Sequence, residues 1–434
     1  MTAEERFDVV VVGAGSAGST AAIAAARSGA RTLLVDRLGF MGGTSTAVLD
    51  TFYAFYTPGE SPRRVVGGLG WEVAQRLTHD GAAFERPNTY GAGTGVTYDQ
   101  EALKLVWEQL AGDAGVRLLL HAWATGVRVH DGQVEAVRTW SKGGKRWFAA
   151  GAVVDASGDA DVSAMAGAAY DDATTTPATQ ALSTLFLLAN VDVARAASVP
   201  KAELWERMRD AAATGEYALP RLEGSWHRTP KPGVVMVHMT RIPNVDATDP
   251  DALTRAETEG RRQVREYHRF LRDRVPGFEA AVVVSTSPAI GVRESRRVFG
   301  DYRLTRDDVL TARRFGDEIA LCGAPIEDHG SGRGTAWDYV ENGGVYGIPY
   351  RTLLPAGIDG LLVAGRCFSA THDAHASARS MATCMAMGEA AGIAAAMAAR
   401  DGTSPRAVDP ALLRAALLER GALLEPVGAA GAPR

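Results

Sequence analysis

The sequence predicts an α/β fold in which a parallel β-sheet, built from both ends of the chain, is interrupted by an inserted α+β unit. Two observations predict this arrangement. Near the N-terminus, a β-forming run at 7–12 leads through a glycine-rich turn into an alanine-rich helix over 16–28 and a second apolar strand at 32–35. Near the C-terminus, a buried strand at 361–364 and a small-residue helix over 381–399 repeat the pattern.

The glycine-rich turn at 13–18 reads Gly-Ala-Gly-Ser-Ala-Gly. Gly13 permits the tight exit from the first strand, and Gly15 has no side chain to keep a pyrophosphate away from the backbone. Gly18 lets the helix pack close to the strand. Glycines at these positions, between a strand and a helix, are typical of a Rossmann-like βαβ unit that binds a dinucleotide.

The helix and the second strand complete this unit. Ser16 and Ala17 open the helix, so its free N–H groups and positive dipole end face the phosphates. Asp36 ends the second strand, 18 residues after Gly18, and a carboxylate near this spacing bonds a ribose hydroxyl. We therefore expect a nucleotide cofactor here, with Arg37 among its contacts.

Length and composition narrow the class of protein. A chain of 434 residues is long enough for two domains, and a net charge of −5 favours neither nucleic acid nor an anionic membrane as a partner. Three cysteines without a CxxC pair indicate reduced thiols, and we expect no metal site. We find no signal-peptide pattern and no uninterrupted apolar stretch of about 18 residues, so the sequence predicts a cytoplasmic protein without a membrane partner.

The pattern divides the chain into a discontinuous nucleotide-binding domain, 1–165 with 341–425, and a substrate domain at 166–340. We expect 47–95 to be an irregular, aromatic-rich cap over the site, and 426–434 to be a frayed tail. The oligomeric state stays open, with a homodimer as one option. Periodicity further predicts helices over 99–111, 201–214 and 253–274, and strands at 116–121, 126–130, 134–140 and 152–155.

Two further segments are suited to the same nucleotide. Gly42, Gly43 and Thr44 follow the second strand, where glycines present backbone N–H groups to a phosphate or to the edge of a flavin ring. The strand predicted at 152–155 runs into small residues, Ser157 and Gly158, beside which a nucleotide can lie closely.

A third segment lies near the C-terminus. Gly365 and Arg366 follow the buried strand there, and a helix begins near Met381. A helix N-terminus aimed at the pyrimidine side of a flavin stabilises the negative charge of the reduced form.

Together these motifs resemble the family of FAD-dependent oxidoreductases that includes the fumarate reductase-like and glutathione reductase-like flavoproteins. The resemblance implies FAD as the cofactor, although Asp36 stands where such enzymes more often have Glu. It also implies that the backbone near Val127 meets the adenine, that Asp159 lies near the ribityl or phosphate groups, and that Gly365 and Arg366 lie beside the ring system or ribityl chain. The matching pieces are 13–18, 36, 42–43, 97–101, 155–161, 293–297, 348–351, 361–366 and 369–392.

Candidate catalytic residues follow from chemistry rather than spacing. Arginine suits a carboxylate because its planar fork matches two oxygens, and histidine suits proton transfer near neutral pH. Structural roles compete with catalytic ones. Arg296 and Arg297 could pair with nearby acids, and the histidines at 372 and 375 could be ordinary loop residues. A metal site at these two histidines is disfavoured because no third ligand is obvious. The candidates are Arg293, Arg296, His329, His372 and His375, with Asp328 and Arg379 as further possibilities.

The sequence therefore predicts an enzyme, an FAD-dependent oxidoreductase that moves a hydride between a polar small molecule, with a carboxylate as one option, and flavin N5. A dehydrogenase or reductase is favoured because the Trp-x-Trp-x-Ile-Pro run of flavin halogenases is absent, and Ala-Gly-Arg at 364–366 replaces the Gly-Asp of many flavin hydroxylases. A monooxygenase or oxidase, a tRNA-modifying flavoprotein and a flavin-binding partner subunit stay as alternatives.

Overall fold

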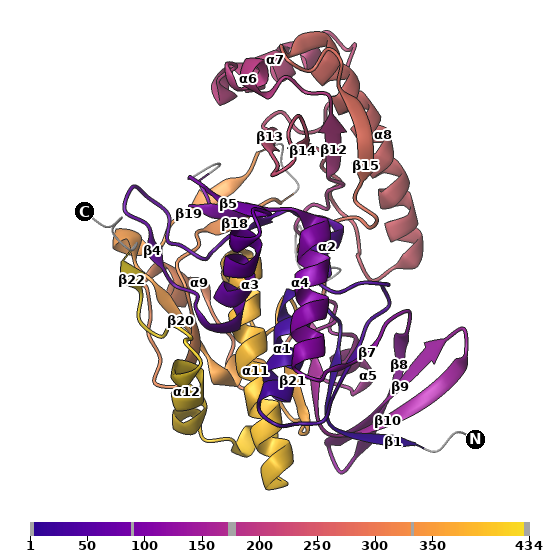
Figure 1. Cartoon of the computed structure of the whole chain (residues 1–434), viewed down its shortest axis with the longest axis vertical. Coiled ribbons are helices and arrows are strands. Elements are labelled where there is room, and N and C mark those ends of the chain that lie inside the picture. Colours follow the sequence, from indigo (N-terminus) through magenta and orange to yellow (C-terminus); the bar gives the residue numbers. More distant parts are fainter. Residues whose placement is uncertain (1–3, 88–90, 172–178, 331–333, 429–434) are drawn as a thin grey trace.

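The computed structural model describes residues 4–87, 91–171, 179–330 and 334–428. Its main sheet has the strand order β7-β2-β1-β10-β9-β8, and β21 also pairs with β10. The lower half of Figure 1 shows this sheet with the helices that cover it. Its strands are β1 (Glu5–Val12), β2 (Thr32–Val35), β7 (Arg117–Leu119), β8 (Trp123–His130), β9 (Gln133–Ser141), β10 (Gly144–Asp155) and β21 (Leu361–Val363).

Strand β10 joins the parts of this sheet. Its first half pairs antiparallel with β9, and it pairs in parallel with β1 and, at its end, with β21. In that register Asp155 lies opposite Val12 on one side and Val363 on the other. The carboxyl ends of three parallel strands from distant parts of the chain therefore meet at one edge, which is where ligands bind in open α/β sheets.

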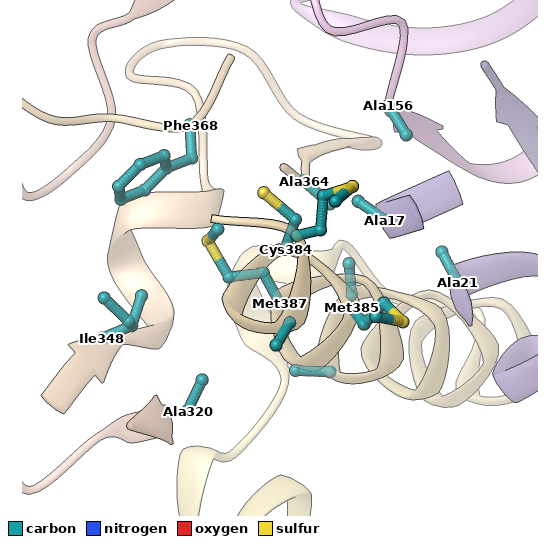
Figure 2. Close-up of a cluster of buried hydrophobic side chains, with 14 of the residues drawn as sticks. Ala17, Ala21, Ala156, Ala320, Ile348, Ala364, Phe368, Cys384, Met385 and Met387 are labelled. Carbon is teal, nitrogen blue, oxygen red and sulfur yellow. The ribbon is translucent and has the colours of Figure 1, made fainter. Parts of the chain in front are cut away.

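Helices α1 (Ser16–Arg27) and α11 (Met381–Asp401) pack against each other because glycines remove the side chains between them. A Cβ at Gly388 would lie 2.0 Å from the carbonyl oxygen of Ala17, and one at Gly392 would lie 2.1 Å from that of Ala21. Figure 2 shows both alanines beside α11. Although α11 is apolar and long enough to cross a membrane, 89% of its most apolar stretch is buried inside the protein.

The segment 47–95 is more regular than the sequence predicted. It holds helix α3 (Gly68–His79) and, with β6, a three-stranded sheet in the order β3-β6-β5. The sequence did not predict α3 because glycines stand at its start. In the first turn of α3, the backbone N–H of Leu69 donates to the carboxylate of Glu389 in α11 at 3.0 Å. These strands are β3 (Thr51–Phe52), β5 (Ala83–Arg86) and β6 (Gly95–Tyr98).

The expected frayed tail at 426–434 was wrong in part. Strand β22 (Val427–Gly428) pairs antiparallel with β4 (Arg63–Arg64), so this part of the tail is tied to the first unit. Residues 429–434 lie outside the described residues.

The upper part of Figure 1 is a second unit with its own hydrophobic core, formed by residues between 186 and 281. Its antiparallel sheet has the order β13-β14-β12-β15. These elements are β12 (Phe186–Ala189), β13 (Ser225–Arg228), β14 (Val235–His238), β15 (Val282–Thr286), α6 (Val193–Ala197), α7 (Lys201–Ala213) and α8 (Pro250–Arg274).

The expected boundary at 340 does not separate two cores. Residues from Val298 onward already pack into the core of the first unit, and β17 (Glu318–Cys322) pairs with β20 (Tyr346–Pro349) across that position. Other elements are α2 (Thr44–Ala47), α4 (Gln100–Asp113), α5 (Asp161–Met165), α9 (Arg306–Leu310), α10 (His372–Ala378), α12 (Pro410–Glu419), β11 (Tyr170–Asp171), β16 (Arg297–Val298), β18 (Ile326–Asp328) and β19 (Ala336–Asp338).

Candidate functional site

A cavity of about 750 Å³ lies at the carboxyl edge of the main sheet and extends to the second unit. It is bounded by the glycine turn after β1, by the ends of β10 and β21, by the start of α11 and by residues of β13 and β14. Of the expected cofactor contacts, it is lined by Gly13, Gly15, Ser16, Ala17, Asp36, Arg37, Gly43, Thr44, Ser157, Gly158, Asp159, Gly365, Arg366 and Met381.

The glycine turn fits an anionic diphosphate. A Cβ at Gly15 would meet no heavy atom within 4 Å, so the space above this backbone is open, whereas one at Gly13 would lie 2.4 Å from the carbonyl oxygen of Ala156. Gly15 is the N-cap of α1, and no side chain caps that helix; Ser380 before α11 also makes no side-chain cap bond. Both helix N-termini therefore offer N–H groups and positive dipole ends to the cavity.

Two of the expected glycine contacts, Gly18 and Gly42, do not line the cavity but allow close packing of the backbone beside it. A Cβ at Gly18 would lie 1.7 Å from the carbonyl oxygen of Gly13, and one at Gly42 would lie 2.4 Å from the side chain of Thr46. Val127 also lies outside the cavity wall, because it is in β8 and packs against the core on the other face of the sheet. Arg37, the residue after Asp36, places its guanidinium 5.3 Å from the ring centre of Trp123.

The carboxylate of Asp36 is held by the backbone around it. Oδ2 accepts from the N–H of Ala14 at 2.5 Å and Oδ1 from that of Leu38 at 2.7 Å, while burial raises the pKa of the group. Each carboxylate oxygen has a further lone pair, so Asp36 can still accept from a ribose hydroxyl.

The loop after β10 is tied to the loop after β21. Buried Asp155 accepts hydrogen bonds from the backbone N–H and hydroxyl groups of Ser157 and Ser163. Arg366 donates to Asp159 at 2.9 Å, and Ser295 donates to the same carboxylate oxygen at 2.7 Å. These bonds fix the two segments that the resemblance places beside the flavin.

Arg293 and His329 are the expected catalytic residues that line the cavity. Arg293 donates to the carbonyl oxygen of Ala181, to Oγ of Ser183 at 3.0 Å and to Nε2 of His238 at 2.9 Å. Burial, then the nearby charges of Arg379 and Arg221, lower the pKa of Arg293 to about 9.

The imidazole of His329 is held at both nitrogens. Nε2 lies 2.9 Å from Oε1 of Glu327, and Nδ1 lies 3.2 Å from the hydroxyl of Thr335. The carboxylate can only accept, so Nε2 carries the proton and Nδ1 accepts. Burial and the charge of Arg293 lower the pKa of His329 to about 3, and the imidazole is therefore neutral.

Glu327 stays ionised beside this imidazole. Burial alone would raise the pKa of its carboxyl, but His329 and the guanidinium groups of Arg379 and Arg293 hold it at about 2. Glu327 and Arg379 also line the cavity.

The remaining candidates, His372, His375 and Arg296, do not line the cavity. His372 bridges Glu294 at 2.9 Å and Asp328 at 3.6 Å, and these carboxylates raise its pKa to about 9. His375 is fully buried and bonds the carbonyl oxygen of Arg366 at 2.8 Å. Arg296 faces Asp161 at 3.5 Å.

These contacts hold His372, His375 and Arg296 in the packed protein around the site, outside the cavity. Among the described residues, no group of three or more His, Cys, Asp and Glu side chains is arranged to hold a metal.

Sequence reasoning missed several lining residues of the second unit and the cap. His238 is the last residue of β14, and burial with the charges of Arg221 and Arg293 lowers its pKa well below the usual value. Alternation places a histidine on one face of a strand but does not show which partner that face meets. The other missed lining residues with polar or charged side chains include Arg86, Lys201, Arg221, His227, Arg228 and Glu327.

Comparisons with known proteins identify the family of this chain. A family model described as "FAD dependent oxidoreductase" matches residues 8–417. Protein FixC of Salmonella typhi is 29% identical over 153 residues, which are 31% of this chain and 33% of that protein, and Protein FixC of Salmonella typhimurium matches equally. The chain thus aligns with about a third of the length of these curated relatives.

The chain also matches solved structures at low sequence identity. A geranylgeranyl bacteriochlorophyll reductase-like protein from Thermoplasma acidophilum is 14% identical with a TM-score of 0.47, covering 96% of this chain and 83% of its own. L-proline dehydrogenase from P. horikoshii is 12% identical with a TM-score of 0.46, covering 90% and 93%. By the family match over nearly its whole length, the chain belongs to the FAD-dependent oxidoreductases, enzymes that carry FAD as their cofactor.

Proposed function

We propose that this enzyme is a dehydrogenase or reductase that moves a hydride between a carboxylate-bearing small molecule and flavin N5. The observation that carries the proposal is the convergence of Arg293, Arg379 and the Glu327–His329 pair on the cavity that the glycine turn also lines. Bound FAD supplies the two-electron donor or acceptor. The glycine turn, Asp36 and the start of α11 would hold it.

Arg293 and Arg379 suit a substrate carboxylate. Within the described ranges, neither guanidinium forms an ion pair with an acidic side chain; their bonds go to carbonyl oxygens, a hydroxyl and an imidazole. Nε of Arg379 is buried without a hydrogen-bond partner. Glu327 is the carboxylate whose charge acts on both guanidinium groups, so one negative charge faces two positive ones. Net positive charge on planar groups with several donors favours an anion with two oxygens.

His329 is suited to hold or move the substrate's proton. Its Nδ1 can take a proton while the N–H at Nε2 keeps its bond to Glu327, whose negative charge stabilises the resulting imidazolium. Burial and the charge of Arg293 lower the pKa of His329. A substrate carboxylate beside Arg293 offsets that charge, which raises the pKa of His329 towards the neutral range where general bases work best.

The test is an anaerobic titration of the FAD-loaded enzyme with a panel of 2-hydroxy and 2-amino acids, and of the reduced enzyme with unsaturated carboxylates. Bleaching of the flavin absorbance by one of the first, or its return with one of the second, is the expected result. Products that form only with dioxygen and contain its labelled oxygen would instead assign a monooxygenase. A flavin that responds to no carboxylate in either state would overturn the proposal.

A further inference from the structure

A second histidine–carboxylate pair lies at the wall of the cavity, in addition to His329 and Glu327. His227 of β13 lines the cavity, and its Nε2 lies 2.8 Å from Oδ1 of Asp50. Asp50 directly precedes β3, so the pair joins the second unit to the first. The two side chains are only 12% and 3% exposed. The proposed function gives this pair no role.

Asp50 determines which nitrogen of His227 carries a proton. A carboxylate can only accept, so the proton lies on Nε2, and the neutral ring keeps an acceptor at Nδ1. Within the part of the chain that the structure describes, the bond to Asp50 is the only hydrogen bond of this ring. Oδ1 of Asp50 also accepts from the hydroxyl of Thr51 at 3.2 Å, which helps to hold the carboxylate in place. His227 is therefore an oriented residue of the cavity wall with an acceptor that no described side chain uses.

The register of the second sheet places His227 close to His238. Strands β13 and β14 pair antiparallel, with Ser225 opposite His238 and His227 opposite Met236. Residues that are opposite one another share a face of the sheet, as do residues two apart, so His227 and His238 are diagonal neighbours on one face. Met236, on the same face, packs in one cluster with Ala47 of the first unit. This face of the sheet is thus turned towards the first unit and the cavity.

His238 connects this face to the guanidinium that we propose to bind the substrate carboxylate. It accepts from Arg293 at 2.9 Å. Burial is the main cause of the lowered pKa of His238, and the charge of His227 is among the smaller causes, as expected for neighbours. Diagonal neighbours in a sheet are about 7–8 Å apart, so one small molecule can contact both Arg293 and His227.

The proposed reaction moves one proton, for which His329 is already suited. A further acceptor can therefore recognise a part of the substrate that does not react. Where an acceptor is shielded from water, it favours a ligand with an O–H or N–H bond, because a ligand without that donor leaves the acceptor unpaired. The difference is about tenfold to a hundredfold in affinity.

We propose that His227, positioned by Asp50, recognises a hydroxyl or amino group that the substrate carries in addition to its carboxylate and its reacting group. Nδ1 of His227 accepts the hydrogen bond of this donor, while Asp50 acts only through the imidazole. The inference rests on the proposed function, because Arg293 holds the carboxylate end. It narrows the substrate class to carboxylates with a second donor, such as dihydroxy acids and hydroxy-amino acids.

The test uses the FAD-loaded enzyme and measures binding by calorimetry and through the flavin absorbance without dioxygen. The probes are matched carboxylates that differ by one donor: lactate, glycerate and isoserine, followed by their homologues with one more carbon. Glycerate or isoserine is expected to bind about tenfold or more tightly than lactate. The comparison of glycerate with isoserine distinguishes a hydroxyl from an amino donor.

His227→Phe removes the acceptor and keeps a ring of similar size, so it is expected to abolish the preference for the second donor. His268→Phe, in α8 of the same unit and outside the cavity, is the matched control and keeps the preference. Equal binding of all probes to the natural chain, or an unchanged preference in His227→Phe, overturns the inference and leaves the proposed function standing. If no carboxylate binds, the proposed function fails and this inference fails with it.

Nitrogen NMR of the histidine rings tests the positioning role of Asp50 without any substrate. At mildly alkaline pH we expect His227 of the natural chain to carry its proton on Nε2. Asp50→Asn introduces an amide that can donate as well as accept, so part of the proton is expected to move to Nδ1 and the preference for the second donor to fall. A proton on Nδ1 in the natural chain, or an Asp50→Asn variant with the same ring protonation and the same preference, contradicts this role.

Discussion

Arg293 donates a hydrogen bond from its guanidinium to Nε2 of His238 across 2.9 Å. An arginine cannot accept, so Nε2 is unprotonated and the proton of His238 lies on Nδ1. Burial and the charges of Arg221 and Arg293 keep His238 neutral by lowering its pKa well below the usual value. The guanidinium that we propose to face the substrate is thus held by a neutral partner, which leaves its positive charge for an anion.

Replacement of Arg293 by Lys tests that role. A lysine keeps one positive charge but loses the planar fork, so we expect KM for the carboxylate substrate to rise about tenfold to a hundredfold, with FAD affinity unchanged. Arg296→Lys, three residues away and outside the cavity, is the control and leaves KM unchanged. Steady-state kinetics of both variants provide the measurement, and equal effects of the two changes would contradict the assignment.

Gly15→Ala tests the diphosphate cradle. The backbone of Gly15 has φ −66°, which alanine adopts readily, and its added methyl group meets no protein atom within 4 Å. We expect the apoprotein to fold normally and to bind FAD about tenfold or more weakly, because the methyl group occupies the approach of the phosphates.

Gly112→Ala in α4 is the matched control, since its Cβ also meets open space but faces away from the cavity. Fluorescence titration of FAD and the melting temperature of each apoprotein separate cofactor loss from misfolding. Unchanged FAD affinity in Gly15→Ala would place the phosphates elsewhere.

His329→Gln tests the proton step. Loss of a general base lowers rates by about 10²–10⁴-fold, so we expect anaerobic flavin reduction to slow by that factor with FAD still bound. Glu327→Gln removes the carboxylate that raises the pKa of His329. The acid limb of kcat/KM should then move to lower pH, with a lower plateau. Full reduction rates in His329→Gln would assign the proton to another group.

His372→Gln tests a structural ion cluster. Asp328 and Glu294 raise the folded-state pKa of His372 to about 9, above the unfolded value of about 6.5, so its stabilisation is complete below pH 6.5 and is lost as pH rises through 9. We expect the variant to lose about 1–3 kcal/mol of unfolding free energy near pH 6, with the gap closing above pH 9.

Denaturant unfolding across this pH range gives the measurement for His372. His130→Gln, at a side chain that is 72% exposed, is the control and is expected to change the free energy of unfolding little. A gap that is constant from pH 6 to pH 10 would show that His372 acts by packing rather than by charge.

The sequence was most informative where a function depends on neighbours in the chain. The glycine turn and Asp36 form a local unit, and both line the cavity. His329 was found because histidine suits proton transfer, but the nearby contact joins Arg293, which lies in a loop, to His238 of β14. Their contact depends on how the second unit sits on the first, which no local pattern carries.

Helix α3 was missed for a different reason. Gly68 and Gly70 lower the helix propensity of its first turn, and the compensating partner, Glu389, lies 320 residues away in the chain. The candidates at 296, 372 and 375 have suitable side chains for catalysis, yet acids and a carbonyl oxygen around them are their partners. Residue type alone does not distinguish a side chain that faces a substrate from one that is held by structural partners.

The packing of α1 on α11 has a consequence for folding. Thr20 of α1 donates a hydrogen bond to the carbonyl oxygen of Met385 in α11, 365 residues further along the chain. Gly388 and Gly392 of α11 let the alanine face of α1 be covered, so that face is shielded from water only when both segments fold together. A fragment that contains the glycine turn but lacks α11 is therefore expected to leave this face exposed and to hold FAD weakly.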